Sequence, residues 1–145
     1  MAQSLILSHS WPLYEAAERL MPGLAAGLAD QRAPAPVGLW TCLLETERLI
    51  WSSAVYTLFG LPAGEPLTRS LAASLYLPGS RGAMETLRAY AIRHRRGFTL
   101  DAQIRRPDGA RRWTRLVALP VLDGRRVVRL TGTKQDVTTV YDGPG

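Results

Sequence analysis

The side chains best suited to chemistry are few in this sequence, and they do not gather in a reactive pattern. There are two histidines, His9 and His94, and a single cysteine, Cys42. A metal site needs several His, Cys, Asp or Glu ligands at short spacings, and the sequence has no such cluster. His94 stands among arginines, where a cation suits the C-terminal end of an expected helix. The sequence therefore predicts no metal site.

Patterns for nucleophilic and phosphate chemistry are missing as well. Residues 60–64 read Gly-Leu-Pro-Ala-Gly, and no Lys-Ser or Lys-Thr pair follows them, so they form a loop and not a phosphate cradle. The carboxylates Asp108, Asp123 and Asp136 fall at expected turns or strand ends, where aspartate bonds to the backbone. No catalytic residue is predicted, and we expect the protein not to be an enzyme.

Length and composition are those of one globular domain. The chain has 145 residues, of which 46% are hydrophobic and 21% charged, enough to bury a core of its own. No stretch approaches the roughly 18 uncharged apolar residues that span a bilayer, and the N-terminus lacks the basic region of a signal peptide. We therefore expect a cytoplasmic protein, without membrane association, from a bacterium with an arginine-rich proteome.

Charge is distributed unevenly along the chain. Residues 1–80 have a net charge of −2 and residues 81–145 one of +8, which gives the net charge of +6. One interpretation is a basic surface for nucleic acid. The other is that solvated arginines lie on the outer faces of strands and turns, where their stems cover apolar surface. The arginines are scattered over several turns without a nucleic-acid-binding signature, which favours the second interpretation.

The last third of the sequence alternates between strands and tight turns. Apolar and polar residues alternate over 98–105, a half-buried strand. Pro107-Asp108-Gly109 then forms a turn in which the glycine takes a positive φ. A second β-rich run covers 113–121 and a third 127–133. Three strands joined by short turns predict an antiparallel meander.

The earlier part of the sequence predicts two strands and three helices. The strands are expected at about 38–45 and 48–52, and the helices at about 53–59, 67–76 and 81–95. Ser80 is the expected N-cap of the last helix, because its hydroxyl can accept a bond from the first turn. Gly97 is expected to stop that helix.

Residues 10–30 form an expected helical extension. Ser10 is its expected N-cap, and Pro22-Gly23 should kink or divide it. Apolar residues at spacings of three or four make one stripe along it: Leu13, Ala17, Leu20, Leu24 and Leu28. We divide the chain into a helical extension with a Pro-rich linker (1–36), a domain (37–140) and a flexible tail (141–145).

Several pieces of the domain together resemble the PAS family. They are Gly38-Leu-Trp40, Leu49-Ile-Trp-Ser52, Tyr56–Gly60, the turn at Arg105–Gly109, Arg112-Trp113, and the closing Asp136-Val-Thr138. The second half is similar to the part of that family called the PAC motif. The resemblance implies an α+β fold with a five-stranded antiparallel sheet and short helices on one face. It also implies a sensory or interaction module.

The resemblance bears on cofactors as well. Relatives that bind haem usually place a histidine inside the long helix, and relatives that form a flavin adduct place a cysteine in the helical region. Here His94 ends the long helix and Cys42 lies in the first strand, so neither cofactor is expected and the ligand is unknown. A pocket between sheet and helices would be lined by large apolar residues, although their filling of the core is the favoured interpretation. They are Trp40, Trp51, Tyr56, Phe59, Tyr76, Leu87, Tyr90, Phe98 and Leu100.

These observations predict a non-catalytic signal-transduction module that acts through protein–protein interaction, with a small ligand as a further input. A basic nucleic-acid-binding regulatory protein is the alternative. The apolar stripe of the extension predicts a homodimer, although the extension could instead fold back on its own sheet; a separate signalling protein is a second kind of partner. The expected contact residues are Trp11, Leu13, Ala17, Leu20, Leu24 and Leu28.

Overall fold

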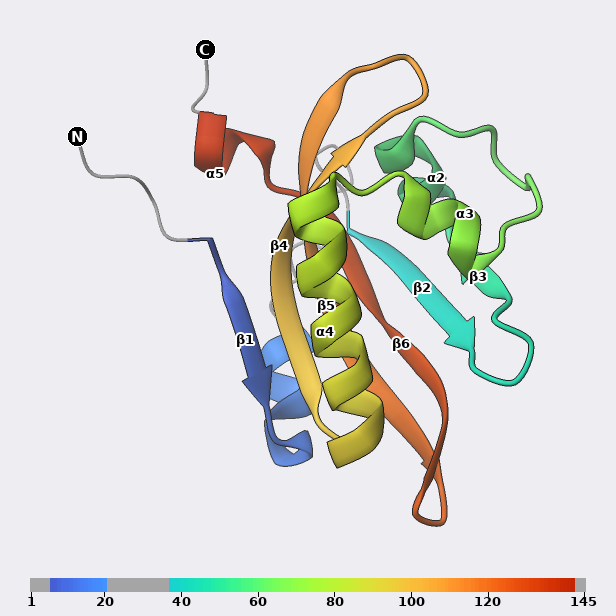
Figure 1. The fold of residues 1–145 in the computed structure, drawn as a ribbon, viewed down its shortest axis with the longest axis vertical. Coiled ribbons are helices and arrows are strands. Elements are labelled where there is room, and N and C mark those ends of the chain that lie inside the picture. Colours follow the sequence, from blue (N-terminus) through green and yellow to red (C-terminus); the bar gives the residue numbers. More distant parts are fainter. Residues whose placement is uncertain (1–5, 21–36, 143–145) are drawn as a thin grey trace.

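A computed structural model describes residues 6–20 and 37–142, which form an antiparallel sheet with helices packed on it (Figure 1). Its strands are β1 (Ser8–Trp11), β2 (Gly38–Leu43), β3 (Leu49–Trp51), β4 (Gly97–Arg105), β5 (Arg111–Asp123) and β6 (Arg126–Asp136), in the order β1-β4-β5-β6-β2-β3. The helices are α2 (Ser53–Phe59), α3 (Arg69–Ser74), α4 (Pro78–His94) and α5 (Thr138–Asp142). The α+β fold expected from the sequence is confirmed.

The predicted meander is formed by β4, β5 and β6. In its first turn Gly109 has a φ of 92°, and the backbone N–H of Ala110 donates to the Asp108 carboxylate at 2.9 Å. In its second turn Gly124 has a φ of 63°. Glycine adopts a positive φ without the steric cost of a Cβ, so both turns form where the sequence predicts them.

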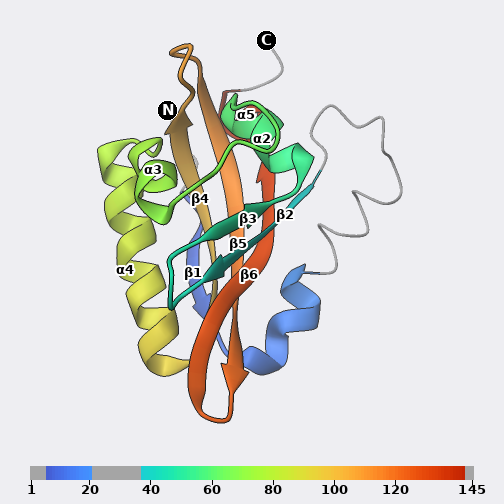
Figure 2. The ribbon, with the colours of Figure 1, turned by 90° about the vertical axis from the view of Figure 1, so that its right-hand side faces the viewer.

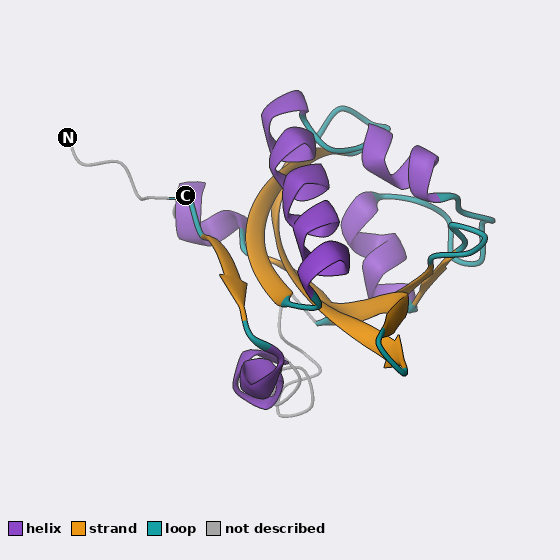
Figure 3. Ribbon diagram, turned by 60° about the horizontal axis from the view of Figure 1, so that its bottom comes forward, coloured by secondary structure: helices purple, strands orange, loops and turns teal. Residues whose placement is uncertain are grey.

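The sheet curves around α2, α3 and α4, which cover one of its faces (Figure 3). The apolar core lies between these helices and the sheet. Along β4, the side chains of Phe98, Leu100, Ala102 and Ile104 are each at most 2% exposed. They occupy alternate positions, because successive side chains of a strand point to opposite faces.

The N-terminal segment differs from its prediction. A helix was predicted to begin at Ser10. In the structure, residues Ser8–Trp11 are extended and pair with β4 at the edge of the sheet. The predicted five-stranded sheet is therefore corrected to six strands. A 3-10 turn, η1 (Leu13–Glu15), and helical residues 16–20 follow. The stripe residues Leu24 and Leu28, the Pro22-Gly23 kink and the Pro-rich linker lie outside the described residues.

Trp11 explains why the chain is extended here. Its side chain is fully buried, and its indole N–H donates to Thr99 Oγ1 at 3.0 Å. The ring lies so close to Gly97 that a Cβ at that position would be 2.2 Å from ring atoms. Gly97 therefore makes room for Trp11 and does not stop α4, which ends at His94 with Arg95 as its C-cap, at a φ of 55°. Burial of a large aromatic ring outweighs the weak helical preference of a few residues.

The long helix also begins differently. It starts at Pro78, a residue that suits the first helical position because its missing N–H would be unpaired there anyway. Ser80 is not the N-cap: its hydroxyl accepts a hydrogen bond from the backbone N–H of Gln103 at 2.8 Å. This bond ties α4 to β4.

The helical residues 16–20 lie on the side of the sheet opposite to α4 (Figure 2). Arg19 in this segment contacts His9 of β1 and forms an ion pair with Glu15. Within the described ranges, no helix is long and apolar enough to cross a membrane.

Candidate functional site

The chain has one lysine among its 18 basic residues, and the fold buries it. Lys134 lies on β6, where the alternation that buries Leu130 and Gly132 also directs position 134 to the helix-covered face. Its side chain is 5% exposed. Lysine is almost never this buried unless it is paired.

Four aromatic rings surround the Lys134 ammonium. Nζ lies 4.8 Å from the ring centre of Phe59, 5.1 Å from that of Trp51, and 5.6 Å from those of Trp40 and Tyr76. All four distances are within the range of cation–π attraction. The rings come from β2, β3, α2 and the segment after α3, so the fold assembles this aromatic cage from four separate parts of the chain.

No negative charge offsets the lysine. Within the described part of the chain, Lys134 forms no ion pair with a carboxylate. Burial lowers the pKa of Lys134 to about 7, and the Cys42 thiol acts weakly in the opposite direction. The rings also favour the charged form, because their faces are negative. Both the amine and the ammonium are therefore accessible near neutral pH.

A small cavity adjoins the aromatic cage. Its volume is ≈50 Å³, and Lys134 and Phe98 line it together with Cys42, Arg69 and Arg88. Arg69 forms ion pairs with Glu85 and Glu47. Arg88 has no carboxylate partner among the described residues and interacts with the Cys42 thiol. Burial raises the pKa of this thiol, and Arg88 opposes part of that rise. Of the three cations that border the cavity, Lys134 and Arg88 have no carboxylate partner among the described residues.

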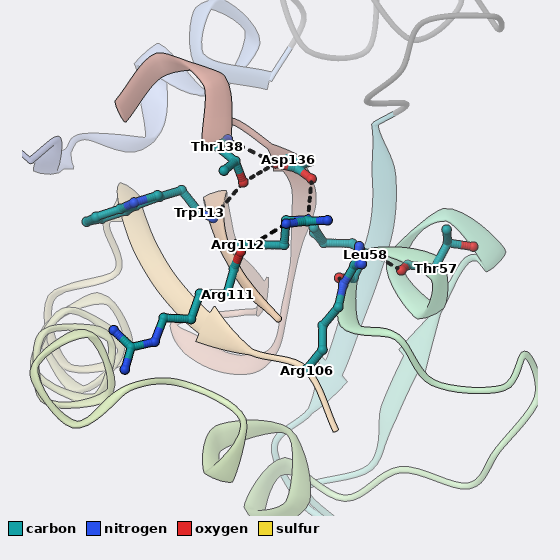
Figure 4. A network of polar contacts seen from close by, with 8 residues as sticks. All are labelled: Thr57, Leu58, Arg106, Arg111, Arg112, Trp113, Asp136 and Thr138. Carbon is teal, nitrogen blue, oxygen red and sulfur yellow. Dashed lines mark hydrogen bonds and ion pairs between the residues drawn. The ribbon is translucent and has the colours of Figure 1, made fainter. Parts of the chain in front are cut away.

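A polar network lies at the end of β6 (Figure 4). The backbone N–H and the hydroxyl of Thr138 both donate to the Asp136 carboxylate, and the backbone N–H of Trp113 donates to Thr138 Oγ1 at 2.9 Å. Arg112 Nε lies 3.8 Å from the other Asp136 oxygen. Nearby, Arg106 donates to the Leu58 carbonyl at 2.8 Å and so caps the end of α2. The contacts of Asp136 and Thr138 fix the point where the sheet passes into α5.

The first and last described segments meet on the outer face of the sheet. Asp101 of β4 is 1% exposed and accepts two hydrogen bonds from Arg115, at 2.8 and 2.9 Å. The Tyr141 hydroxyl of α5 donates to the same carboxylate, and the Asp101 backbone N–H donates to the Leu7 carbonyl. A bidentate arginine pair of this kind is strong and geometrically specific. Asp101 therefore joins both ends of the domain to the sheet.

Similar proteins were found by structure and not by sequence. No family model and no curated protein matches the chain. The N-terminal PAS/PAC sensor domain of a Marinobacter aquaeolei diguanylate cyclase superposes with a TM-score of 0.67 at 19% identity, over 72% of this chain and 98% of that one. A sensory box histidine kinase/response regulator of Burkholderia thailandensis gives 0.63 at 20% identity, over 73% and 80%. The chain has the PAS fold. The LOV domain of an Erythrobacter litoralis blue-light activated histidine kinase gives 0.57 at 22% identity, over 71% and 97%.

Within the PAS fold the predicted pocket residues separate into three groups. Trp40, Trp51, Phe59 and Tyr76 form the aromatic cage, and Phe98 lines the cavity. The side chains of Tyr56, Leu87 and Leu100 belong to the core or pack against it. Tyr90 is 46% exposed and lies against His94.

Sequence reasoning missed Lys134 itself, although two signals were present. One is the single lysine in a chain that otherwise uses arginine. The other is the period of β6, which puts position 134 on the same face as the buried Leu130. Of the expected dimer contacts, Trp11 is fully buried, Leu13 and Leu20 are half-buried and Ala17 is exposed.

Proposed function

We propose that this PAS-fold chain is a non-catalytic sensory module that acts through protein–protein interaction, with the state of Lys134 as its input. The observation that carries the proposal is a buried cation that has no counter-ion among the residues that the structure describes. Such a cation costs stability, and a strongly shifted pKa beside a cavity is characteristic of functional sites. The similar structures named above are described as sensor domains or as parts of sensor kinases, which supports the same assignment.

Lys134 lies close to the residues that connect β6 with α5. Lys134 and Asp136 are neighbours on one face of β6, and Asp136 anchors Thr138 at the start of α5. In the sheet, Lys134 pairs with Gly38 and Leu116, and Asp136 pairs with Thr114. A change in the position or charge of Lys134 would therefore act on the end of β6, on α5, and through Tyr141 on Asp101 and the N-terminal strand.

The proposed output is self-association through the outer face of the sheet. Leu39 and Ile50, on the adjacent strands β2 and β3, are 52% and 51% exposed. Together with Leu20 they border an open hollow of ≈460 Å³. A two-fold interface would bury this apolar patch of both copies. A separate signalling protein that covers the same patch is the other form of the proposal.

Sedimentation velocity tests this output. The wild-type protein should self-associate, and the double variant Leu39→Glu/Ile50→Glu should not, because the variant places charge at the centre of the contact. Tyr90→Glu is the matched control, since Tyr90 is similarly exposed but lies on α4, and it should leave association unchanged. A wild type that is monomeric at every concentration would remove self-association as the output.

The nucleic-acid alternative rests on net charge. Several arginines are engaged inside the chain: Arg81 donates to the carbonyls of Ala73 and Ser74, Arg106 caps α2, and Arg115 pairs with Asp101. This leaves fewer basic side chains for phosphate contacts. Steep salt dependence of binding to single-stranded or duplex DNA would favour the alternative.

A further inference from the structure

We infer that Lys134 captures carbon dioxide reversibly as a lysine carbamate inside the cavity beside the aromatic cage. The inference names the input of the proposed sensory function, and only its consequence for signalling rests on that function. The modification itself can be tested without any partner.

The size of the cavity restricts the ligand. At ≈50 Å³ it has room for about one or two water-sized molecules, whereas sites for metabolites are usually about 300 Å³ or more. A flavin, a haem or a dicarboxylic acid does not fit without rearrangement of the core. A molecule of three atoms does.

The chemistry of the amine selects among such small molecules. Burial holds the pKa of Lys134 near 7, so an uncharged amine with a free lone pair is present at neutral pH, and desolvated lysines are nucleophiles. The lone pair attacks the carbon of CO2 and forms an N–C bond, while one C–O π pair moves onto oxygen. The nitrogen then loses one proton to solvent. The products are a carbamate anion and a proton, and nothing is oxidised or reduced.

The charges that face Lys134 suit this product. The cavity is bordered by Cys42 from β2, Arg69 from α3 and Arg88 from α4, with Tyr76 in the cage. The described residues that line it include no carboxylate. Arg69 is engaged by Glu85 and Glu47, but Arg88 has no carboxylate partner within the described ranges. A buried anion requires a partner of opposite charge. Arg88 is that partner for the carbamate.

The modification also reverses the interaction with the aromatic cage. Ring faces attract an ammonium and repel an anion, because the aromatic quadrupole is negative above the ring. The carbamate would therefore leave the rings and turn toward Arg88. Lys134 is two residues from Asp136 on β6, so the movement would occur next to the residue that anchors the start of α5.

Carbon-13 NMR of the protein equilibrated with labelled CO2 and bicarbonate tests the inference. The chain has one lysine, so the only other primary amine is the α-amino group, and the variant Lys134→Arg removes the side-chain signal alone. We expect a carbamate resonance in the wild type, at a pH about one unit above the pKa of Lys134, that is missing in Lys134→Arg. Trapping the carbamate by alkylation, followed by peptide mass spectrometry, should place it on Lys134 in the wild-type protein itself.

Two further variants test the role of Arg88. Arg88→Gln should lower carbamate occupancy at a fixed CO2 pressure by about tenfold, the loss of one charge-assisted contact. Arg93→Gln is the matched control, because Arg93 lies on the same helix and is exposed, and it should change nothing. The inference is overturned if no resonance depends on Lys134, or if chloride or formate binds at the cavity while labelled CO2 gives no covalent product. A carbamate that forms without affecting association would instead count against the proposed function.

Discussion

The ammonium of Lys134 lies 4.8 Å from the centre of the Phe59 ring, and three more rings lie within 5.6 Å. The rings replace part of the hydration that the ammonium loses on burial. They supply no negative charge, and burial lowers the pKa of Lys134 to about 7. The domain thus contains a basic group that changes protonation near neutral pH inside its core.

Stability should depend on pH through this group. The pKa of Lys134 is about 7 in the folded protein, below its ordinary value of 10.5, so between these values the unfolded chain binds one more proton. The free energy of unfolding should therefore rise with pH across this range, by at most about 1.4 kcal/mol per pH unit from this residue. Urea unfolding of the wild type and of Lys134→Met at several pH values isolates the contribution. Identical slopes in both proteins would contradict it.

At pH 6 the variant Lys134→Met should be more stable than the wild type. Methionine keeps an unbranched chain of similar length and removes the buried charge, and replacement of buried charges by apolar groups can stabilise by about 1–4 kcal/mol. Arg93→Met, at an exposed position of α4, is the control and should change the free energy of unfolding little. A less stable Lys134→Met would mean that the cage stabilises the ammonium more than burial destabilises it.

The aromatic cage should accept a free amine once its own lysine is gone. In Lys134→Ala the four rings would surround a vacant space, and the face of each ring attracts cations. We expect methylammonium or propylammonium to raise the melting temperature of this variant in a saturable way. Leu130→Ala, which removes a buried side chain from the same strand, provides the comparison and should not respond to amines.

Two glycine substitutions separate crowding from backbone strain. Gly97→Ala places a Cβ against the Trp11 ring and should release β1 from the sheet. The release would be seen as faster hydrogen exchange at the Asp101 N–H, which donates to the Leu7 carbonyl.

Gly109→Val has open space around its Cβ but a φ of 92°. It should lower the free energy of unfolding by about 1–3 kcal/mol through backbone strain alone. Unchanged stability in Gly109→Val would mean that this turn relaxes freely.

Local patterns predicted most of the sheet and missed the features that depend on distant contacts. The turn at Pro107-Asp108-Gly109 depends on three consecutive residues, and the alternation along β4 depends on nine consecutive residues. Both patterns are therefore local. The end of the strand, at Ser10 and Trp11, was predicted to begin a helix, because its extended form depends on the fit of Trp11 against Gly97, 86 positions away. Ser80 was assigned as a cap for the same reason, since its partner is the distant Gln103.

The candidate site could be predicted only in part. Its aromatic residues were recognised because large apolar side chains in this fold face the interior. The role of Lys134 depends on rings from β2, β3, α2 and the segment after α3, which no local pattern brings together. The lack of a carboxylate partner for Lys134 among the described residues is likewise a property of the assembled core.

We propose that a change in the charge or position of Lys134 alters the end of β6. Hydrogen exchange, measured by NMR under one set of conditions for the wild type and Lys134→Met, tests it most directly. The amides to follow are Val137 N–H, which donates to the Trp113 carbonyl at 2.8 Å, and Trp113 N–H, which donates to Thr138 Oγ1 at 2.9 Å. We predict that their protection changes by about tenfold or more relative to Gly109 N–H in the distant turn, which corresponds to about 1.4 kcal/mol in local stability. Equal shifts at all three amides, or none, would contradict the claim.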